Sequence, residues 1–186
     1  MLILASASPR RHELLAQAGL TFEVHAAHID ESRQPNEPPA NYVRRLALEK
    51  AQAIHSRFPN ATILGADTTV VLDNEIMNKP TGLADAERML RALSGRTHQV
   101  YTGIAVVTAS TQRVHLETTH VSFSEIGAAD LTHYLASGDP LDKAGAYGIQ
   151  GFAARWIPRI EGDYFNVVGL PIAATIRLLR ESGFPS

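Results

Sequence analysis

Apolar residues along the chain fall into short continuous or alternating runs and into stripes with helical spacing. The first run covers residues 2–5 and is followed by small hydroxyl residues and Pro9. Apolar positions then recur at helical spacing as far as Ala18, and Gly19 follows. This pattern predicts a short strand that leads into a helix, with Ser8 as the N-cap residue and Pro9 in the first helical position.

The same reasoning divides the rest of the chain. Apolar positions three and four residues apart predict helices over residues 40–58, 84–93, 127–137 and 171–181. Alternating or β-branched positions predict strands over residues 21–26, 62–66, 68–72, 75–77, 97–107, 113–123 and 152–160. The two longest strands are separated by a short polar connection, which favours an antiparallel hairpin. Helices and strands alternate irregularly, which indicates an α/β protein with a mixed sheet.

The length and composition narrow the class of protein. A chain of 186 residues suffices for one well-buried core or for two small lobes that share a sheet, and we take residues 1–186 as a single domain. Hydrophobic residues make up 45% and charged residues 19%, which is typical of a soluble globular protein. No apolar run approaches the roughly 20 residues that cross a bilayer, and no signal segment is recognisable. We therefore expect a cytoplasmic protein without a membrane partner.

Charge and cysteine content limit the chemistry. A formal net charge of −2 argues against nucleic acid as a partner, which would require a basic face. The chain has no cysteine, so any metal would use oxygen or imidazole ligands. The eight histidines form no recognisable metal-ligand pattern, and neither a Walker loop nor a dinucleotide fingerprint occurs. Kinase, P-loop and Rossmann-type functions are therefore disfavoured.

The first helix is predicted to begin with basic residues. Arg10 and Arg11 lie in its first turn, where the helix dipole favours anions and opposes cations. Together with Ser8 and the backbone N–H groups, the two arginines would form a phosphate cradle at a strand-to-helix junction. An ordinary capped helix with solvated arginines explains the same residues, and this stretch alone does not decide between the two interpretations.

Further candidates lie near the ends of predicted elements or on an apolar face. Asp67 follows a buried strand, and Glu31 lies in a polar loop. Asp67 either makes a turn hydrogen bond and Glu31 is solvated, or the two carboxylates hold a metal and activate water. Lys50 falls on the apolar stripe of a helix and Lys79 on a loop; each is either a solvated lysine or a phosphate ligand. The last two candidates are Thr68 and Gln150. Each either makes a turn or strand-edge hydrogen bond or recognises a base edge or a phosphate, and the spacing does not decide between the two interpretations.

Six segments in this order resemble the Maf family of nucleoside triphosphate pyrophosphatases over essentially the whole chain. They are residues 5–11 (ASASPRR), 47–51 (ALEKA), 65–68 (GADT), 79–80 (KP), 142–151 (DKAGAYGIQG) and 166–171 (NVVGLP). The resemblance implies an inosine-triphosphatase-like α/β fold, in which helices flank a mixed, strongly twisted sheet and two lobes surround a central cleft. Asn78 and Ala7 depart mildly from the family pattern, and neither removes a functional group.

The resemblance also implies roles for the candidate residues. Asp67 would be the catalytic proton acceptor and, with Glu31, would hold Mg²⁺ or Mn²⁺. Phosphates would be held by Ser8, Arg10, Lys50 and Lys79. Substrate choice would depend on Arg11, Thr68 and Gln150. On this basis we expect the Arg11 head group to serve the ligand, so that its loss would not unfold the protein.

The implied reaction is hydrolysis of dTTP and UTP, and of modified pyrimidine nucleotides, between the α and β phosphates. Such an enzyme releases the monophosphate and pyrophosphate and removes unwanted nucleotides. Two alternatives stay open: a nucleotide-binding regulator of septum formation and cell division, and a pyrophosphatase for 7-methyl-GTP. The 7-methyl-GTP subgroup typically differs at Thr68 and Gln150. The resemblance further suggests a homodimer.

Overall fold

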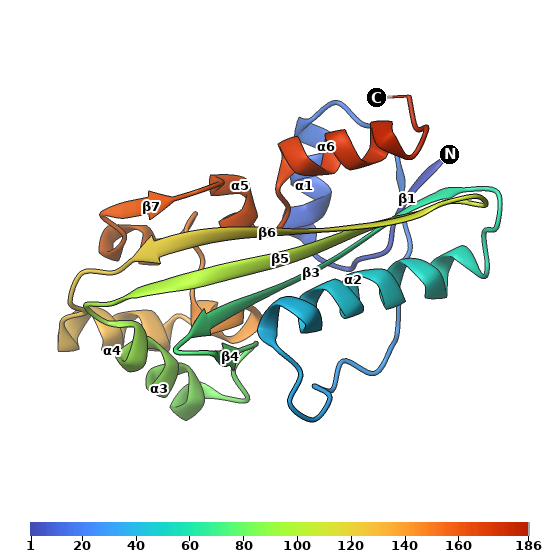
Figure 1. Ribbon diagram of the computed structural model, residues 1–186. Helices are drawn as coiled ribbons and strands as arrows, with labels where there is room; N and C mark the ends of the chain where they lie inside the picture. The colour runs from blue at the N-terminus through green and yellow to red at the C-terminus, as the bar shows by residue number, and fades with distance from the viewer. Residues whose placement is uncertain (186) are drawn as a thin grey trace. The chain divides into compact units, whose positions relative to one another are not determined.

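The computed structural model describes residues 1–185 and contains the expected mixture of helices and strands (Figure 1). The strands are β1 (Leu2–Leu4), β2 (Glu23–Val24), β3 (Thr62–Leu72), β4 (Glu75–Met77), β5 (Thr97–Val107), β6 (Gln112–Ser122) and β7 (Arg159–Glu161). The α-helices are α1 (Pro9–Gln17), α2 (Pro39–His55), α3 (Leu83–Leu93), α4 (Ala128–Ala136), α5 (Tyr164–Val168) and α6 (Ile172–Glu181). Short 3₁₀ helices are η1 (Asp139–Asp142), η2 (Ala144–Ala146) and η3 (Phe152–Trp156).

The strands form one mixed sheet, as the sequence predicts. Their order is β2-β1-β3-β5-β6-β7, and β4 pairs with β3. β1 is parallel to both of its neighbours, whereas β4 and β7 are antiparallel to their partners. β5 and β6 are neighbours joined by a tight turn, and a connection that short is possible only for antiparallel strands, which confirms the predicted hairpin. No helix within residues 1–185 is long and apolar enough to cross a membrane.

The chain divides into two compact units, and β3, β5 and β6 contribute residues to both. The first unit comprises Met1–Thr68, Thr102–Glu117 and the segment from Gly169 onward. The second comprises Thr69–Tyr101 and Thr118–Val168. Both units are therefore discontinuous in sequence, and the first is assembled from three separate segments.

In the first unit, helices cover both faces of the sheet. α2 lies along one face, and α1 and α6 lie on the other (Figure 1). The apolar stripe of α2 packs on the strands through Ala47, Ala51 and Ile54, which are buried together with Ile63 of β3 and Ala105 of β5. These small and branched side chains let the helix lie close to the sheet.

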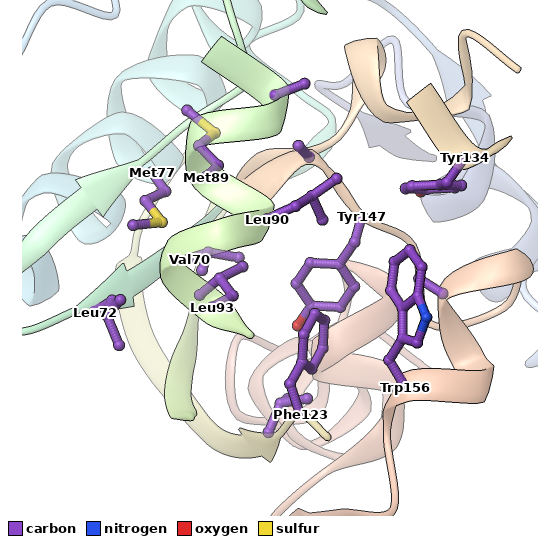
Figure 2. Packing of buried hydrophobic residues seen from close by; sticks show 14 of the residues in the cluster. Val70, Leu72, Met77, Met89, Leu90, Leu93, Phe123, Tyr134, Tyr147 and Trp156 are labelled. Carbon is purple, nitrogen blue, oxygen red and sulfur yellow. The ribbon is translucent and has the colours of Figure 1, made fainter. Parts of the chain in front are cut away.

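The second unit has a separate core rich in aromatic side chains. Met89, Leu90 and Leu93 of α3 belong to this cluster, and Leu90 points toward Tyr147 (Figure 2). Further buried members of this cluster are Val70, Leu72, Met77, Tyr134 and Trp156. Rings in the cluster meet edge to face, as in the pair Phe123–Tyr147 with centroids 4.8 Å apart, which is a favoured aromatic arrangement.

The prediction of a strand over residues 152–160 is wrong for its first half. Residues 152–156 form η3, and only Arg159–Glu161 pairs as β7. Phe152 and Trp156 are four residues apart, and their rings pack on each other with centroids 5.6 Å apart. Aromatic residues that suggest a strand by propensity therefore pack on each other within a short helix.

Smaller differences concern the ends of elements. The strand predicted over residues 21–26 is reduced to the two residues of β2, although the N–H of His25 still donates to the carbonyl of Leu4 at 3.0 Å. α2 begins one residue earlier than predicted, at Pro39, and ends at His55. Helix α5 is an element that the hydrophobic pattern did not reveal.

Candidate active site

Asp67 lies inside a strand and not at its end. β3 runs without interruption from Thr62 to Leu72, so the predicted break at residue 67 is wrong. The β-branched residues that follow Asp67 continue the extended backbone, and only Asp73 and Asn74, both with positive φ, turn the chain. The Asp67 side chain is therefore held by the sheet, with 8% of the residue exposed.

The ammonium group of Lys50 joins two carboxylates. Its Nζ atom lies 2.7 Å from Asp67 Oδ1 and 2.8 Å from Glu31 Oε1. Lys50 lies on the buried face of α2, as predicted, but its head group ends between these acids instead of extending into water. Burial raises the pKa of Asp67 above its ordinary value, and the positive charges of Lys50 and Arg11 limit that rise. The structure therefore brings three of the predicted residues together.

Two glycines allow α2 to come this close to the sheet. A Cβ atom on Gly65 of β3 would lie 2.1 Å from the carbonyl oxygen of Ala47. A Cβ atom on Gly103 of β5 would lie 2.3 Å from the carbonyl oxygen of Val43. Both distances are far below a van der Waals contact, so the backbone of α2 rests directly on two strands because neither position carries a side chain.

The guanidinium of Arg11 makes hydrogen bonds to other residues of the chain. Nε donates to the carbonyl of Gly169 at 2.8 Å, and Nη1 donates to Ser6 Oγ at 3.1 Å and to the carbonyl of Ala66 at 3.0 Å. Nη2 donates to Thr68 Oγ1 at 2.9 Å. Desolvation lowers the pKa of Arg11, while the carboxylate of Asp67 opposes this shift. The expectation that this head group serves the ligand alone is therefore wrong, because it connects α1 to β3 and to the chain at Gly169.

Besides Arg11, the Thr68 side chain contacts two residues that were not predicted as site residues, Thr102 and Gly169. Its Oγ1 lies 2.9 Å from Thr102 Oγ1 and donates to the carbonyl of Gly169 at 3.3 Å. Thr102 is fully buried, and a threonine in a β-rich run carries no signal of such a contact. Gly169 lies in the segment of residues 166–171, which resembles the Maf family. Its φ of 131° is a backbone conformation that glycine adopts readily.

The start of α1 has the predicted form. Ser8 is the N-cap residue with an extended backbone, and Pro9 occupies the first turn. The Ser8 side chain makes no capping hydrogen bond; its N–H donates to Ser6 Oγ at 3.2 Å. The first turn contains no acidic residue, and Arg10 is half-buried. A helix start without a side-chain cap and with basic residues is suited to an anion.

Two candidates belong to the second unit. Lys79 is exposed in the loop after β4. Gln150 is exposed in a turn in which the N–H of Gly151 donates to the carbonyl of Gly148 at 3.1 Å. The other seven belong to the first unit: Ser8, Arg10, Arg11, Glu31, Lys50, Asp67 and Thr68. The roles of Lys79 and Gln150 stay predictions.

The carboxylates suit a metal that is shared with a substrate. Across residues 1–185, no three histidine or acidic side chains gather to hold a metal ion by themselves. Asp67 and Glu31 nevertheless converge on one cation, the ammonium of Lys50. Protein sites for Mg²⁺ commonly contribute one or two carboxylates, while phosphates and water complete the coordination. The donor set therefore fits a divalent ion that arrives with a polyphosphate.

A sequence model of one protein family matches almost the entire chain. The family is described as "Maf-like protein", and the match covers residues 1–182. The chain belongs to the Maf family. The segments that hold Arg11, Lys50, Asp67 and Gly169 therefore lie within the region that defines the family.

Similar Maf proteins carry an enzymatic name. The chain is 50% identical over 182 residues to a protein of Koribacter versatilis, covering 98% of this chain and 94% of that one. It is 52% identical over 184 residues to a protein of Moorella thermoacetica, with 98% and 95% covered. Both relatives are named dTTP/UTP pyrophosphatase.

Solved structures show more distant likenesses. A Ham1 protein of Staphylococcus aureus is 14% identical with a TM-score of 0.49, covering 66% of this chain and 71% of that one. A HAM1 protein of Coxiella burnetii is 14% identical with a TM-score of 0.45, covering 82% and 89%.

Proposed function

We propose that this protein is a nucleoside triphosphate pyrophosphatase that hydrolyses dTTP and UTP to the monophosphate and pyrophosphate. The observation that carries the proposal is the Lys50 ammonium between the carboxylates of Asp67 and Glu31. Relatives about 50% identical over nearly their full length bear this activity in their names. An enzyme that removes free nucleotides would work in the cytoplasm.

Asp67 is the group to accept a proton from water. A general base works best when its pKa lies near the working pH, and burial moves the pKa of Asp67 upward from the ordinary range. The attacking water forms a new P–O bond while the α–β bridging P–O bond breaks, and its proton passes to the Asp67 carboxylate. Lys50 keeps Asp67 and Glu31 close together by offsetting the repulsion between their negative charges.

The charged groups of the first unit suit a triphosphate. The backbone N–H groups at the start of α1, with Ser8 and Arg10, would hold phosphate oxygens. Asp67 and Glu31 would hold Mg²⁺ or Mn²⁺, which when bound supplies positive charge to the phosphates and lowers the pKa of bound water. Arg11 holds Thr68 in place, and Thr68 with Gln150 would contribute to the choice of base.

The test is a nucleotide panel with the purified protein. UTP, dTTP, 7-methyl-GTP and ATP are incubated with Mg²⁺ or Mn²⁺, and pyrophosphate and monophosphate are measured. We expect pyrophosphate from UTP and dTTP, loss of activity on chelation of the metal, and loss in Asp67→Asn. Asp73→Asn is the matched control, since this exposed turn residue pairs with surface Arg96.

Three other results would contradict the proposal. Preference for 7-methyl-GTP would assign the enzyme to that substrate. Release of orthophosphate would mean that a different bond is cleaved. Binding of nucleotide without turnover would favour the regulator of cell division.

A further inference from the structure

The loop that presents Glu31 has no helix or strand of its own. We call residues 30–37 the Glu31 loop. The Glu31 side chain is 54% exposed, yet its carboxylate lies 2.8 Å from Lys50 Nζ. An exposed side chain on an irregular segment loses conformational entropy when it is held at one place. Something else in the structure must therefore fix the loop before Glu31 can be placed reproducibly.

A buried ion pair fastens the far end of this loop to α2. Glu37 is 8% exposed, and its two carboxylate oxygens accept from Arg45 Nε at 2.7 Å and from Arg45 Nη2 at 2.8 Å. The N–H of Gln34 also donates to Glu37, at 3.1 Å. Hydrogen bonding with Arg45 lowers the pKa of Glu37, and the same contact raises the pKa of Arg45. Such a two-pronged pair fixes direction as well as distance.

Backbone carbonyls of the loop are anchored on the same helix. Tyr42 Oη donates to the carbonyl of Glu31 at 2.9 Å, and Arg45 Nη2 donates to the carbonyl of Ser32 at 3.0 Å. The Arg45 guanidinium also lies over the Tyr42 ring, 5.7 Å from its centroid. Residue 31 and its neighbour are thus held from α2 through the main chain, independently of the Glu31 carboxylate.

The spacing on α2 explains how one helix can do this. Residues 42, 45 and 49 are three and four apart and so lie on one side of the helix, where Arg45 Nη1 also donates to Glu49 at 3.1 Å. Lys50 is the next residue after this row, on the side that faces Asp67. The helix that brings Lys50 to Asp67 therefore also carries the anchors of the loop that brings Glu31 to Lys50.

We propose that Arg45 is a positioning residue for the reaction, which holds the Glu31 loop on α2 so that the Glu31 carboxylate stays at Lys50 beside Asp67. Arg45 acts through Glu31 and has no role of its own in the chemistry. The kinetic part of this inference rests on the proposed function. The structural part, that Arg45 orders the loop, does not.

The decisive experiment is a double-mutant cycle between Arg45 and Glu31. In the otherwise native enzyme we expect Arg45→Met to lower kcat by about tenfold, equivalent to about 1.4 kcal/mol, with a smaller change in KM. In a Glu31→Gln background the same substitution should change kcat by less than about twofold, because the group that Arg45 positions is already lost. Equal losses in both backgrounds would overturn the proposal.

Two further variants separate positioning from damage to the fold. Tyr42→Phe removes the hydroxyl that donates to the carbonyl of Glu31 and leaves the Glu37–Arg45 pair, so it tests the same idea if Arg45→Met folds poorly. We expect a smaller fall in kcat than for Arg45→Met, and no fall in the Glu31→Gln background. Arg91→Met is the matched control, because Arg91 is an exposed arginine paired with Glu87 on α3. It should leave kcat unchanged, and a comparable loss there would contradict a specific role for Arg45.

Hydrogen exchange supplies a readout that needs no substrate. Arg45→Met should speed amide exchange at Ser32 and Gln34, whose N–H groups are hydrogen-bonded in the loop, while the amides of α2 stay protected. Unchanged exchange in the loop would overturn the structural part. If the native protein releases no pyrophosphate from any nucleotide, the proposed function fails, and the exchange result still decides whether Arg45 orders the loop.

Discussion

Lys50 Nζ lies 2.7 Å from Asp67 Oδ1, and both side chains are almost completely removed from solvent. Charges in such surroundings depend on their partners, because water contributes little to their stabilisation. Glu31 completes the arrangement from the solvent side, where its side chain remains half exposed. The positive charge of one lysine therefore balances the negative charges of a buried and an exposed carboxylate. Removing this lysine should destabilise the buried Asp67 carboxylate more than the exposed Glu31 carboxylate.

Replacing Lys50 by Met should destabilise the protein as well as stop turnover. The buried Asp67 carboxylate would lose its closest cation, and breaking a buried pair in this way typically costs about 3 kcal/mol or more. Urea unfolding at pH 7 measures the loss. The double variant Lys50→Met/Asp67→Asn should regain much of the stability, since no buried charge then remains unpaired. A double variant less stable than Lys50→Met would contradict this explanation.

Arg11→Ala should lower stability, contrary to the expectation from sequence alone. Four hydrogen bonds from the guanidinium would be lost, and charged donors of this kind contribute enough that a total of about 3 kcal/mol is expected. The melting temperature is the measurement. Arg177→Ala on the exposed side of α6 is a control in the same unit and should melt like the native protein. A native melting temperature for Arg11→Ala would return Arg11 to a purely ligand-binding role.

His98 should make the second unit sensitive to mild acid. It is 2% exposed, contacts Phe123 and Tyr147, and burial lowers its pKa from 6.5 to about 3. Between these pH values the unfolded imidazole binds a proton that the folded one does not. The free energy of unfolding should therefore fall as the pH decreases, by about 1.4 kcal/mol per pH unit from this group.

The comparison variant for this prediction is His98→Gln, which cannot take up a proton. Its unfolding free energy, measured by urea titration at pH 7, 6 and 5, should decline less steeply than that of the native protein. Parallel curves for the two proteins would show that His98 does not cause the acid sensitivity.

Local periodicity was enough to predict most of the fold. The stripe on α2 placed Lys50 on the buried face, and the long alternating runs predicted the β5–β6 hairpin. Failures occurred where two local signals compete. Phe152 and Trp156 favour a strand by residue type, whereas the packing of their rings on each other favours the short helix that the structure contains.

The candidate site was predictable in its residue types but not in its contacts. Basic residues at a helix start and acids near apolar runs indicate phosphate chemistry, and the structure does bring Glu31, Lys50 and Asp67 together. No spacing rule shows that the carbonyl of Gly169 meets Arg11 across 158 positions of sequence, or that Arg45 pairs with Glu37. Such contacts depend on the tertiary arrangement, which propensities do not contain.

The close approach of α2 to Gly65 and Gly103 has a consequence for how this protein can vary. A single methyl group at either position would clash with the backbone of α2, push the helix away from the sheet and shift Lys50 relative to Asp67. The distance between the Lys50 ammonium and the Asp67 carboxylate thus depends partly on the absence of side chains at Gly65 and Gly103. Changes that leave every acid, arginine and lysine in place can still dismantle the site, so an intact set of charged residues is not a sufficient sign of an active relative.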